Sequence, residues 1–123
     1  MLEPAKTVEL FQKQPGEQIF YPGDVIFEDG HKGDVMYGII EGVVELFVNG
    51  QVIETIKTGD VFGEGALVHD EHTRASTAIA KTECKLAYLD QERFLFVVQE
   101  TPMFALYVIR SYSDRLRRLK LSL

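Results

Sequence analysis

The chain has 123 residues, of which 46% are hydrophobic and 26% charged, and its formal net charge is -6. This length and balance are typical of one folded globular domain, which we expect to span residues 1–123. The negative charge argues against general binding to nucleic-acid backbones or to anionic membrane surfaces, because like charges repel. An anionic ligand must therefore be held by a local arrangement of donors.

The single cysteine and the absence of long apolar runs bear on the compartment. Cys84 is the one cysteine of the chain, so no internal disulfide can form, as suits a reducing compartment. Its apolar neighbours predict a buried structural thiol rather than a nucleophile. No run approaches the roughly 20 apolar residues of a membrane span. We therefore expect a cytoplasmic protein with no membrane segment.

Two regions of different pattern come first along the chain. Residues 5–14 place Val8, Leu10 and Phe11 at helical spacing, and Pro15-Gly16 predicts the end of that helix. Residues 17–90 then hold short runs rich in Val, Ile, Phe and Tyr, separated by turns that contain glycine. This pattern predicts a mainly β fold with flanking helices, an antiparallel β-barrel of the jelly-roll (double-stranded β-helix) kind.

One of these turns predicts its own geometry. Asn49-Gly50 separates the apolar runs 43–48 and 51–56. Both central residues of a type I′ turn need positive φ, which asparagine and glycine adopt with the least strain. We therefore predict a β-hairpin here, although the imperfect alternation of 51–56 does not define its buried face.

The pattern becomes helical from about residue 91 to residue 120. Residues 91–100 have helical spacing, with Asp90 as the expected N-cap. Thr101-Pro102 predicts the start of a second helix, with threonine at the cap and proline in the first turn, running to about Lys120.

Apolar residues recur along this second helix with steps of four and three. Two interpretations stay open: the helix packs on its own barrel, or it forms a seam with a second copy of the chain. The seam residues are Ala105, Ile109, Tyr112, Leu116, Leu119 and Leu123.

The most informative stretch for chemistry is residues 59–77. Its glycines expose backbone N–H groups, and a short helix is expected to start near Glu64. Arg74 can add a bidentate, charge-assisted contact to an anion. Glu64 is a poor phosphate ligand but a good acceptor for a hydroxyl. The pair suits a ligand that carries a phosphate and a hydroxyl close together, such as a ribose cyclic phosphate.

Residues 62–77 resemble the phosphate-binding cassette of the cyclic-nucleotide-binding domain family, which includes kinase regulatory subunits, cyclic-nucleotide-gated channels and catabolite activator proteins. The matching segments are Phe62-Gly63-Glu64, Ala66-Leu67 and Arg74-Ala75-Ser76-Thr77. Further similarity extends over about residues 15–118, including the turn segments 22–27, 33–37 and 41–44. The resemblance implies the barrel fold, a cyclic-nucleotide ligand and no enzymatic activity.

The resemblance also implies roles for individual residues. Glu64 would bind the ribose 2′-hydroxyl and Arg74 the cyclic phosphate. Ala75 stands where relatives that prefer cyclic GMP often carry threonine, which favours cyclic AMP. A residue of the C-terminal helix would cover the purine, and Tyr107, Ile109 and Tyr112 are the candidates. The complete expected ligand-binding set is Gly63, Glu64, Gly65, Ala66, Arg74, Ala75 and Ser76.

The chain departs from the family pattern at three points. Gly65 stands where an apolar residue is usual, and Thr73 stands where proline is common. Asp70 and Glu71 lie in the loop before Arg74, and either could pair with it when no ligand is bound. These differences predict weaker or more mobile ligand binding rather than its loss.

Rival functions find less support. His69 and His72 lack the spacing of a metal-binding cupin, and no nucleophile–base pair can be placed, so we expect neither a metal nor a cofactor nor catalysis. The basic C-terminal run is expected from the helix dipole, and we expect no DNA-binding domain in this chain. Two functions remain: a cyclic-nucleotide sensor that moves its C-terminal helix against an effector protein or a second subunit, and a ligand-independent dimerisation or docking module.

Overall fold

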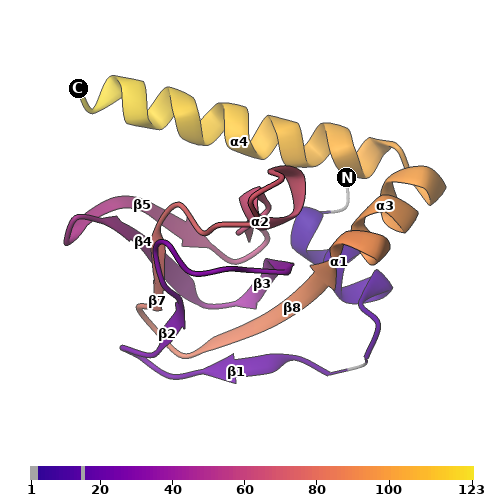
Figure 1. Ribbon diagram of the computed structural model, residues 1–123, viewed down its shortest axis with the longest axis horizontal. Coiled ribbons are helices and arrows are strands. Elements are labelled where there is room, and N and C mark those ends of the chain that lie inside the picture. The colour runs from indigo at the N-terminus through magenta and orange to yellow at the C-terminus, as the bar shows by residue number, and fades with distance from the viewer. Residues whose placement is uncertain (1–2, 15) are drawn as a thin grey trace.

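The computed structural model describes residues 3–14 and 16–123. Eight strands form two antiparallel sheets, and helices lie at one end and along one side (Figure 1). The elements are α1 (Pro4–Phe11), β1 (Gln18–Phe20), β2 (Val25–Phe27), β3 (Val35–Glu41), β4 (Val43–Val48), β5 (Gln51–Lys57), β6 (Val61–Phe62), α2 (Gly65–Val68), β7 (Thr77–Ala80), β8 (Cys84–Asp90), α3 (Gln91–Glu100) and α4 (Met103–Leu121).

The two sheets confirm the mainly β jelly-roll fold but correct the expectation of a closed barrel. One sheet has the order β1-β8-β3-β6 and the other β2-β7-β4-β5. No strand in the described ranges is hydrogen-bonded into both sheets, so the molecule is a sandwich whose edge strands are β1 and β6 in one sheet and β2 and β5 in the other. A sandwich buries one face of each sheet without the strand tilt that closure requires.

The Asn49-Gly50 hairpin forms as predicted between β4 and β5. Asn49 has φ 52° and Gly50 has φ 76°, as a type I′ turn requires. Val44 pairs with Ile56, and both are fully buried, so this face of the hairpin lies in the core. The tertiary structure thereby settles the buried face that the imperfect alternation left open.

The N-terminal helix packs on the first sheet. α1 ends at Phe11, three residues earlier than expected, and Pro15, the expected terminator, lies outside the described residues. Val8 is fully buried against β3, where Gly38 provides the space: a Cβ at Gly38 would stand 2.9 Å from the Cα of Ala5. Cys84 is buried as predicted and its Sγ donates to the Val43 carbonyl at 3.3 Å.

The two C-terminal helices begin differently from each other. Asp90 caps α3 as predicted, because its Oδ1 accepts from the backbone N–H of Arg93 at 2.8 Å. Thr101 does not cap α4 with its side chain, which corrects that expectation. Thr101 is instead the C-cap residue of α3. Pro102 occupies the N-cap of α4 and makes no side-chain hydrogen bond there. Proline fits there because a helix start leaves that N–H unpaired anyway.

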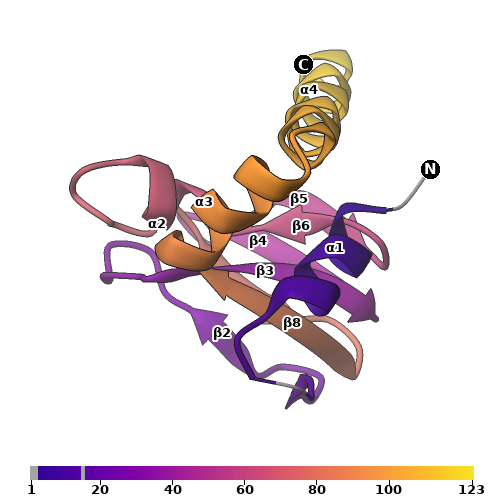
Figure 2. The same cartoon turned by 90° about the vertical axis from the view of Figure 1, so that its right-hand side faces the viewer.

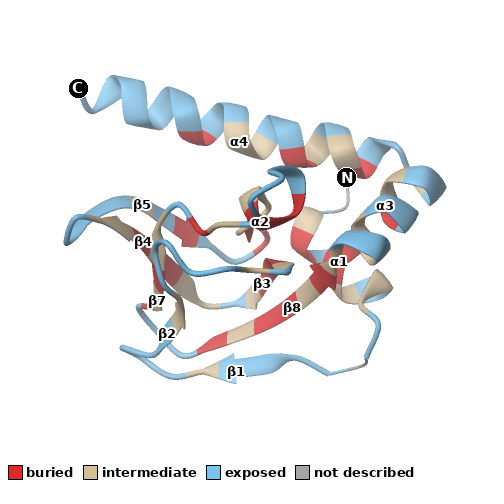
Figure 3. Cartoon of the chain, viewed as in Figure 1, coloured by how far each residue is buried: buried red, intermediate tan, exposed pale blue. Residues whose placement is uncertain are grey.

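Helix α4 crosses above the open side of the sandwich (Figures 1 and 2). Its buried residues are Phe104, Val108 and Arg115. The side of the helix that faces away from the sheets is exposed (Figure 3). Ile109 and Leu116, two residues of the predicted seam, are 64% and 52% exposed. The helix therefore packs on its own domain, with Tyr112 of the seam turned to the core while Ile109 and Leu116 stay exposed. None of the described helices is long and apolar enough to cross a bilayer.

Candidate ligand-binding site

The seven residues expected to bind ligand surround one pocket. Strand β6 leads into the left-handed turn at Gly63 (φ 81°), then α2 begins at Gly65, and the following loop returns to β7. The pocket has a volume of about 190 Å³. Its lining includes all of the expected set: Gly63, Glu64, Gly65, Ala66, Arg74, Ala75 and Ser76.

Arg74 lines the pocket, and only 5% of the residue is exposed. Its Nη1 donates to the Gly63 carbonyl and its Nη2 to the Val35 carbonyl, each at 2.8 Å. Its guanidinium lies 4.1 Å from the centre of the Phe27 ring. Its Nε is buried and has no hydrogen-bond partner within the described part of the chain. A buried cation with a free donor and no carboxylate partner is suited to accept an anion.

The glycines around Arg74 make room for its side chain. A Cβ at Gly33 would overlap the Arg74 guanidinium, standing 2.5 Å from Cζ. A Cβ at Gly63 would lie 2.9 Å from Nη1, in addition to the strain of its positive φ. The resemblance placed Gly33 in a turn. In the structure, the lack of a side chain at Gly33 also leaves space for the guanidinium of Arg74.

Glu64 lines the same pocket and is partly buried at the N-cap of α2. Burial raises the pKa of the Glu64 carboxyl, with the Arg115 guanidinium acting in the other direction. A partly desolvated carboxylate gains from any hydroxyl that donates to it, because that hydrogen bond replaces lost hydration. The pocket thus offers a cation and an acceptor in one space.

The acidic loop does not neutralise Arg74, contrary to the expectation that Asp70 or Glu71 could do so. Neither carboxylate forms an ion pair with Arg74, whose guanidinium donates to backbone carbonyls instead. The loop is fixed by its backbone: the Glu71 carbonyl accepts from Lys32 at 2.5 Å. Arg74 is therefore not blocked by a carboxylate.

His72 contacts the cassette through the backbone of helix α2. Its Nδ1 lies 2.7 Å from the Ala66 carbonyl, and the residue has φ 54°. In the described residues, no group of three or more His, Cys, Asp or Glu side chains is arranged to hold a metal ion. Gly65, the departure from the family pattern, has open surroundings: its Cβ would meet only His69, at 3.6 Å.

Helix α4 closes the remaining side of the pocket with Tyr112 and Arg115. Among the three candidates for covering a base, only Tyr112 lines this pocket. Tyr107 lines a separate groove near α1, and Ile109 lines an apolar depression between α4, Val68 and Phe94 that shares Glu64 and Tyr112 with the pocket. The structure thus brings one of the three to the site.

Arg115 anchors α4 to the sandwich, and the sequence interpretation missed it. Its side chain is 4% exposed; Nε contacts Glu54 Oε1 at 2.8 Å and Nη1 donates to the Val61 carbonyl at 2.7 Å. Its guanidinium also lies 4.0 Å from the centre of the Tyr112 ring. In the sequence Arg115 is one of several cations near the helix end, so nothing local distinguished it from a residue that complements the dipole.

The family comparison matches residues 17–101, which is more than half of the chain, to the cyclic nucleotide-binding domain. The chain belongs to this family and is a cyclic-nucleotide-binding regulatory domain. Two curated relatives agree: it is 38% identical over 79 residues to the cAMP-dependent protein kinase regulatory subunit of Yarrowia lipolytica, and 41% identical over 69 residues to the cGMP-dependent protein kinase of Plasmodium berghei.

These matches cover only part of each protein. The kinase alignments span 63% and 54% of this chain, but 21% and 8% of the two relatives. Among solved structures, the catabolite activator protein of Thermus thermophilus superposes with a TM-score of 0.76 at 25% identity, covering 99% of this chain and 58% of that one. The family and the fold are shared, whereas the whole activities of these larger proteins are not thereby assigned to this chain.

Proposed function

We propose that this domain binds cyclic AMP in the pocket between Arg74 and Glu64 and has no catalytic activity of its own. The observation that carries the proposal is the buried guanidinium of Arg74, which among the described residues has no partner for its Nε and no ion pair with a carboxylate. The cyclic phosphate would bind Arg74, and the ribose 2′-hydroxyl would donate to Glu64. Backbone groups of Gly63, Gly65 and Ala66, with Ala75 and Ser76 beside them, complete the wall of the pocket.

The size of the pocket supports a movement of α4 on binding. Its volume of about 190 Å³ is below the ~300 Å³ at which pockets for small organic ligands usually begin. Tyr112 and Arg115 on α4 fill the side that would receive the purine. A ligand that binds better when α4 has shifted moves the helix by population shift, and this movement would be the signal to an effector protein or a second subunit.

The preference for cyclic AMP rests on Ala75. Its methyl group offers no hydrogen bond to guanine, while relatives that prefer cyclic GMP often carry a threonine there. The names of the two relatives include both cyclic AMP and cyclic GMP, so Ala75 and not membership of the family carries this preference.

The test is calorimetric titration with cyclic AMP, cyclic GMP and 5′-AMP as control. Binding of cyclic AMP should be tighter than that of cyclic GMP and much tighter than that of 5′-AMP. Arg74→Ala should weaken cyclic AMP binding by about 2–5 kcal/mol, more than about thirtyfold, because a buried charge-assisted contact is lost. Arg117→Ala, which removes an exposed charge on α4, is the matched control and should bind as wild type.

Two results would contradict the proposal. One is an Arg74→Ala protein that stays folded and binds cyclic AMP as tightly as wild type. The other is a wild-type protein that shows no heat and no thermal stabilisation with either cyclic nucleotide at millimolar concentration. The exposed apolar residues of α4 favour the alternative in that case, a ligand-independent dimerisation or docking module.

A further inference from the structure

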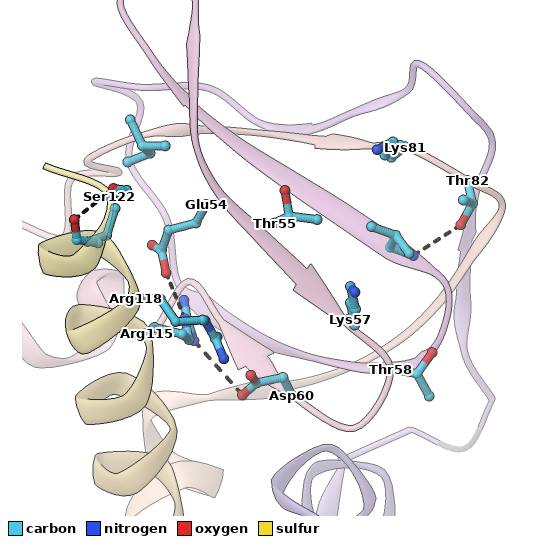
Figure 4. Close-up of a pocket in the computed structure, with 13 residues that line it drawn as sticks. Glu54, Thr55, Lys57, Thr58, Asp60, Lys81, Thr82, Arg115, Arg118 and Ser122 are labelled. Atoms are coloured by element: carbon cyan, nitrogen blue, oxygen red, sulfur yellow. Dashed lines mark hydrogen bonds and ion pairs between the residues drawn. The ribbon is translucent and has the colours of Figure 1, made fainter.

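One ion pair joins the sheet to α4 in the wall of the nucleotide pocket. Glu54 of β5 and Arg115 of α4 both line this pocket, and both also line a groove of about 780 Å³ that adjoins it (Figure 4). Glu54 Oε1 accepts from Arg115 Nε at 2.8 Å. The proposed ligand contacts of Arg74 and Glu64 do not use this pair, so its position in the pocket wall points to a separate role.

The pair is largely withdrawn from water. The side chains of Arg115 and Glu54 are 4% and 18% exposed. Arg115 Nη1 also donates to the Val61 carbonyl of β6 at 2.7 Å, and the guanidinium lies 4.0 Å from the centre of the Tyr112 ring. Removal of one partner from a buried ion pair is strongly unfavourable, because it leaves an uncompensated buried charge. The position of Arg115 against the sheets therefore depends on the charge of Glu54.

The position of α4 that forms this pair is also the position that narrows the pocket. The pocket volume of about 190 Å³ is below the ~300 Å³ usual for small organic ligands, and Tyr112 and Arg115 line it from α4. A shift of α4 away from β5 separates Arg115 from Glu54, because the two residues belong to different elements. The free energy of the pair thus opposes opening. A measured affinity is the intrinsic affinity reduced by the fraction of molecules that can bind.

From this geometry we propose that Glu54 is a positioning residue, which holds α4 over the empty pocket through Arg115 and thereby lowers the affinity of the domain for its nucleotide. Glu54 acts through Arg115 and makes no contact with the ligand. The inference rests on the proposed function, because it concerns the regulation of the same pocket. It assigns the two carboxylates of the pocket opposite effects: Glu64 favours binding, whereas Glu54 opposes it.

The first experiment is calorimetric titration with cyclic AMP of variants that break the pair from either side. Glu54→Gln keeps the shape of the side chain but removes its charge, and should bind about tenfold more tightly than wild type, because more molecules are open. Arg115→Gln should also bind more tightly. The matched control is Glu45→Gln on the neighbouring strand β4. Glu45 is partly buried like Glu54, does not line the pocket and forms no ion pair among residues 3–14 and 16–123, so this variant should bind as wild type.

The Arg115 variant separates this proposal from a direct effect of charge on the ligand. Loss of a carboxylate near an anionic ligand would by itself tighten binding, but loss of a guanidinium would weaken it. Weaker binding by Arg115→Gln would therefore overturn the proposal, as would wild-type affinity in Glu54→Gln. Since either single change already breaks the pair, the double variant should bind no more tightly than the tighter single variant. Additive gains in the double variant would also overturn the proposal.

A second measurement follows α4 without any ligand. In nucleotide-free Glu54→Gln, the backbone amides in the second half of α4 should exchange hydrogen faster than in wild type, because the helix leaves the sheets more often. Glu45→Gln should exchange as wild type. Equal exchange in all three proteins would overturn the proposal. Because this measurement needs no nucleotide, it decides the role of Glu54 even where no protein binds cyclic AMP, a result that would contradict the proposed function alone.

Discussion

Arg74 and Glu64 show how burial prepares two ordinary surface residue types for a ligand. Desolvation lowers the pKa of Arg74 and raises that of Glu64, so each charge is held at a cost in the empty pocket. A ligand that supplies an anion to one and a hydroxyl to the other removes part of both costs at once. The guanidinium of Arg74 contacts two backbone carbonyls and the Phe27 ring, and none of these groups neutralises its charge.

The raised pKa of Glu64 predicts how Glu64→Gln changes stability with pH. A carboxyl whose folded pKa lies above its unfolded value contributes stability below the unfolded pKa and loses it as pH rises through the folded pKa. At pH 7 the charged Glu64 is therefore destabilising, so Glu64→Gln should melt at a higher temperature than wild type. The difference should disappear at acidic pH, below the ordinary pKa of the carboxyl.

Thermal melts of both proteins between pH 4 and 8 (about the range over which a carboxyl with a raised pKa titrates) provide the measurement, and calorimetry should show weaker cyclic AMP binding by Glu64→Gln. A variant that melts below wild type at pH 7 would mean that ionised Glu64 stabilises the empty fold.

The space beside Arg74 gives a second prediction at this scale. Gly33→Ala should both destabilise the fold and weaken cyclic AMP binding, because the new Cβ overlaps the guanidinium and must displace it. Gly65→Ala is the matched control, since its Cβ meets only an ordinary contact and replaces the poorest helix former after proline, a gain of up to ~1 kcal/mol. Chemical denaturation of both variants measures the change in unfolding free energy, and calorimetry measures the change in cyclic AMP affinity. Equal behaviour of the two alanines would refute the steric role of Gly33.

At the scale of elements, α4 is held to the sandwich by apolar contacts in its first half and by one buried charge in its second half. Its apolar contacts come from Phe104 and Val108 near its start, while Arg115 fixes its second half to β5 and β6. A helix fixed by an ion pair in its second half can be released by any ligand that competes for that pair. Glu64 lies close enough to Arg115 for their charges to interact, so the anchor and the ligand site are neighbours.

The anchor can be measured by a double-mutant cycle. Arg115→Met should cost about 3 kcal/mol of unfolding free energy, because it leaves Glu54 partly buried and unpaired. Adding Glu54→Leu should restore much of that loss, since an apolar pair can replace a buried ion pair. Urea denaturation of the two single variants and the double variant gives the coupling energy. Additive losses would show that Arg115 and Glu54 act independently.

At the scale of the whole molecule, the exposed side of α4 is the surface through which a second copy could dock. Ile109 and Leu116 of the predicted seam are exposed and border an apolar depression that also includes Val68 and Phe94. Clustered exposed apolar residues of this kind mark interaction sites.

We therefore expect a homodimer whose stability depends on the seam. Light scattering during gel filtration should give a mass that rises toward two chains with concentration. Ile109→Gln/Leu116→Gln should stay monomeric, because the apolar area that association would bury is lost. Leu10→Gln, at an equally exposed leucine on α1, should dimerise like wild type. A wild-type protein that remains monomeric at high concentration would exclude this route of signalling.

Local chemistry was enough to predict much of this protein. The Asn49-Gly50 hairpin, the Asp90 cap and the start of a short helix near Glu64 each depend on a few neighbouring residues, so the sequence alone determined them. The cassette residues were also found together because the resemblance covers them as one segment. Sequence alone failed where a side chain's role depends on distant partners.

The tertiary structure decided the rest, because it brings together groups far apart in the chain. Arg115 pairs with Glu54, which is 61 residues away, and Arg74 donates to Val35, which is 39 residues away. No local pattern could indicate that the loop acids leave Arg74 unpaired, or that Thr101 closes α3 rather than caps α4. The shape of the sandwich beneath α4 likewise determined which face of the helix is buried. The spacing of apolar residues along the helix is compatible both with a packed face and with an exposed seam, so it could not decide between them.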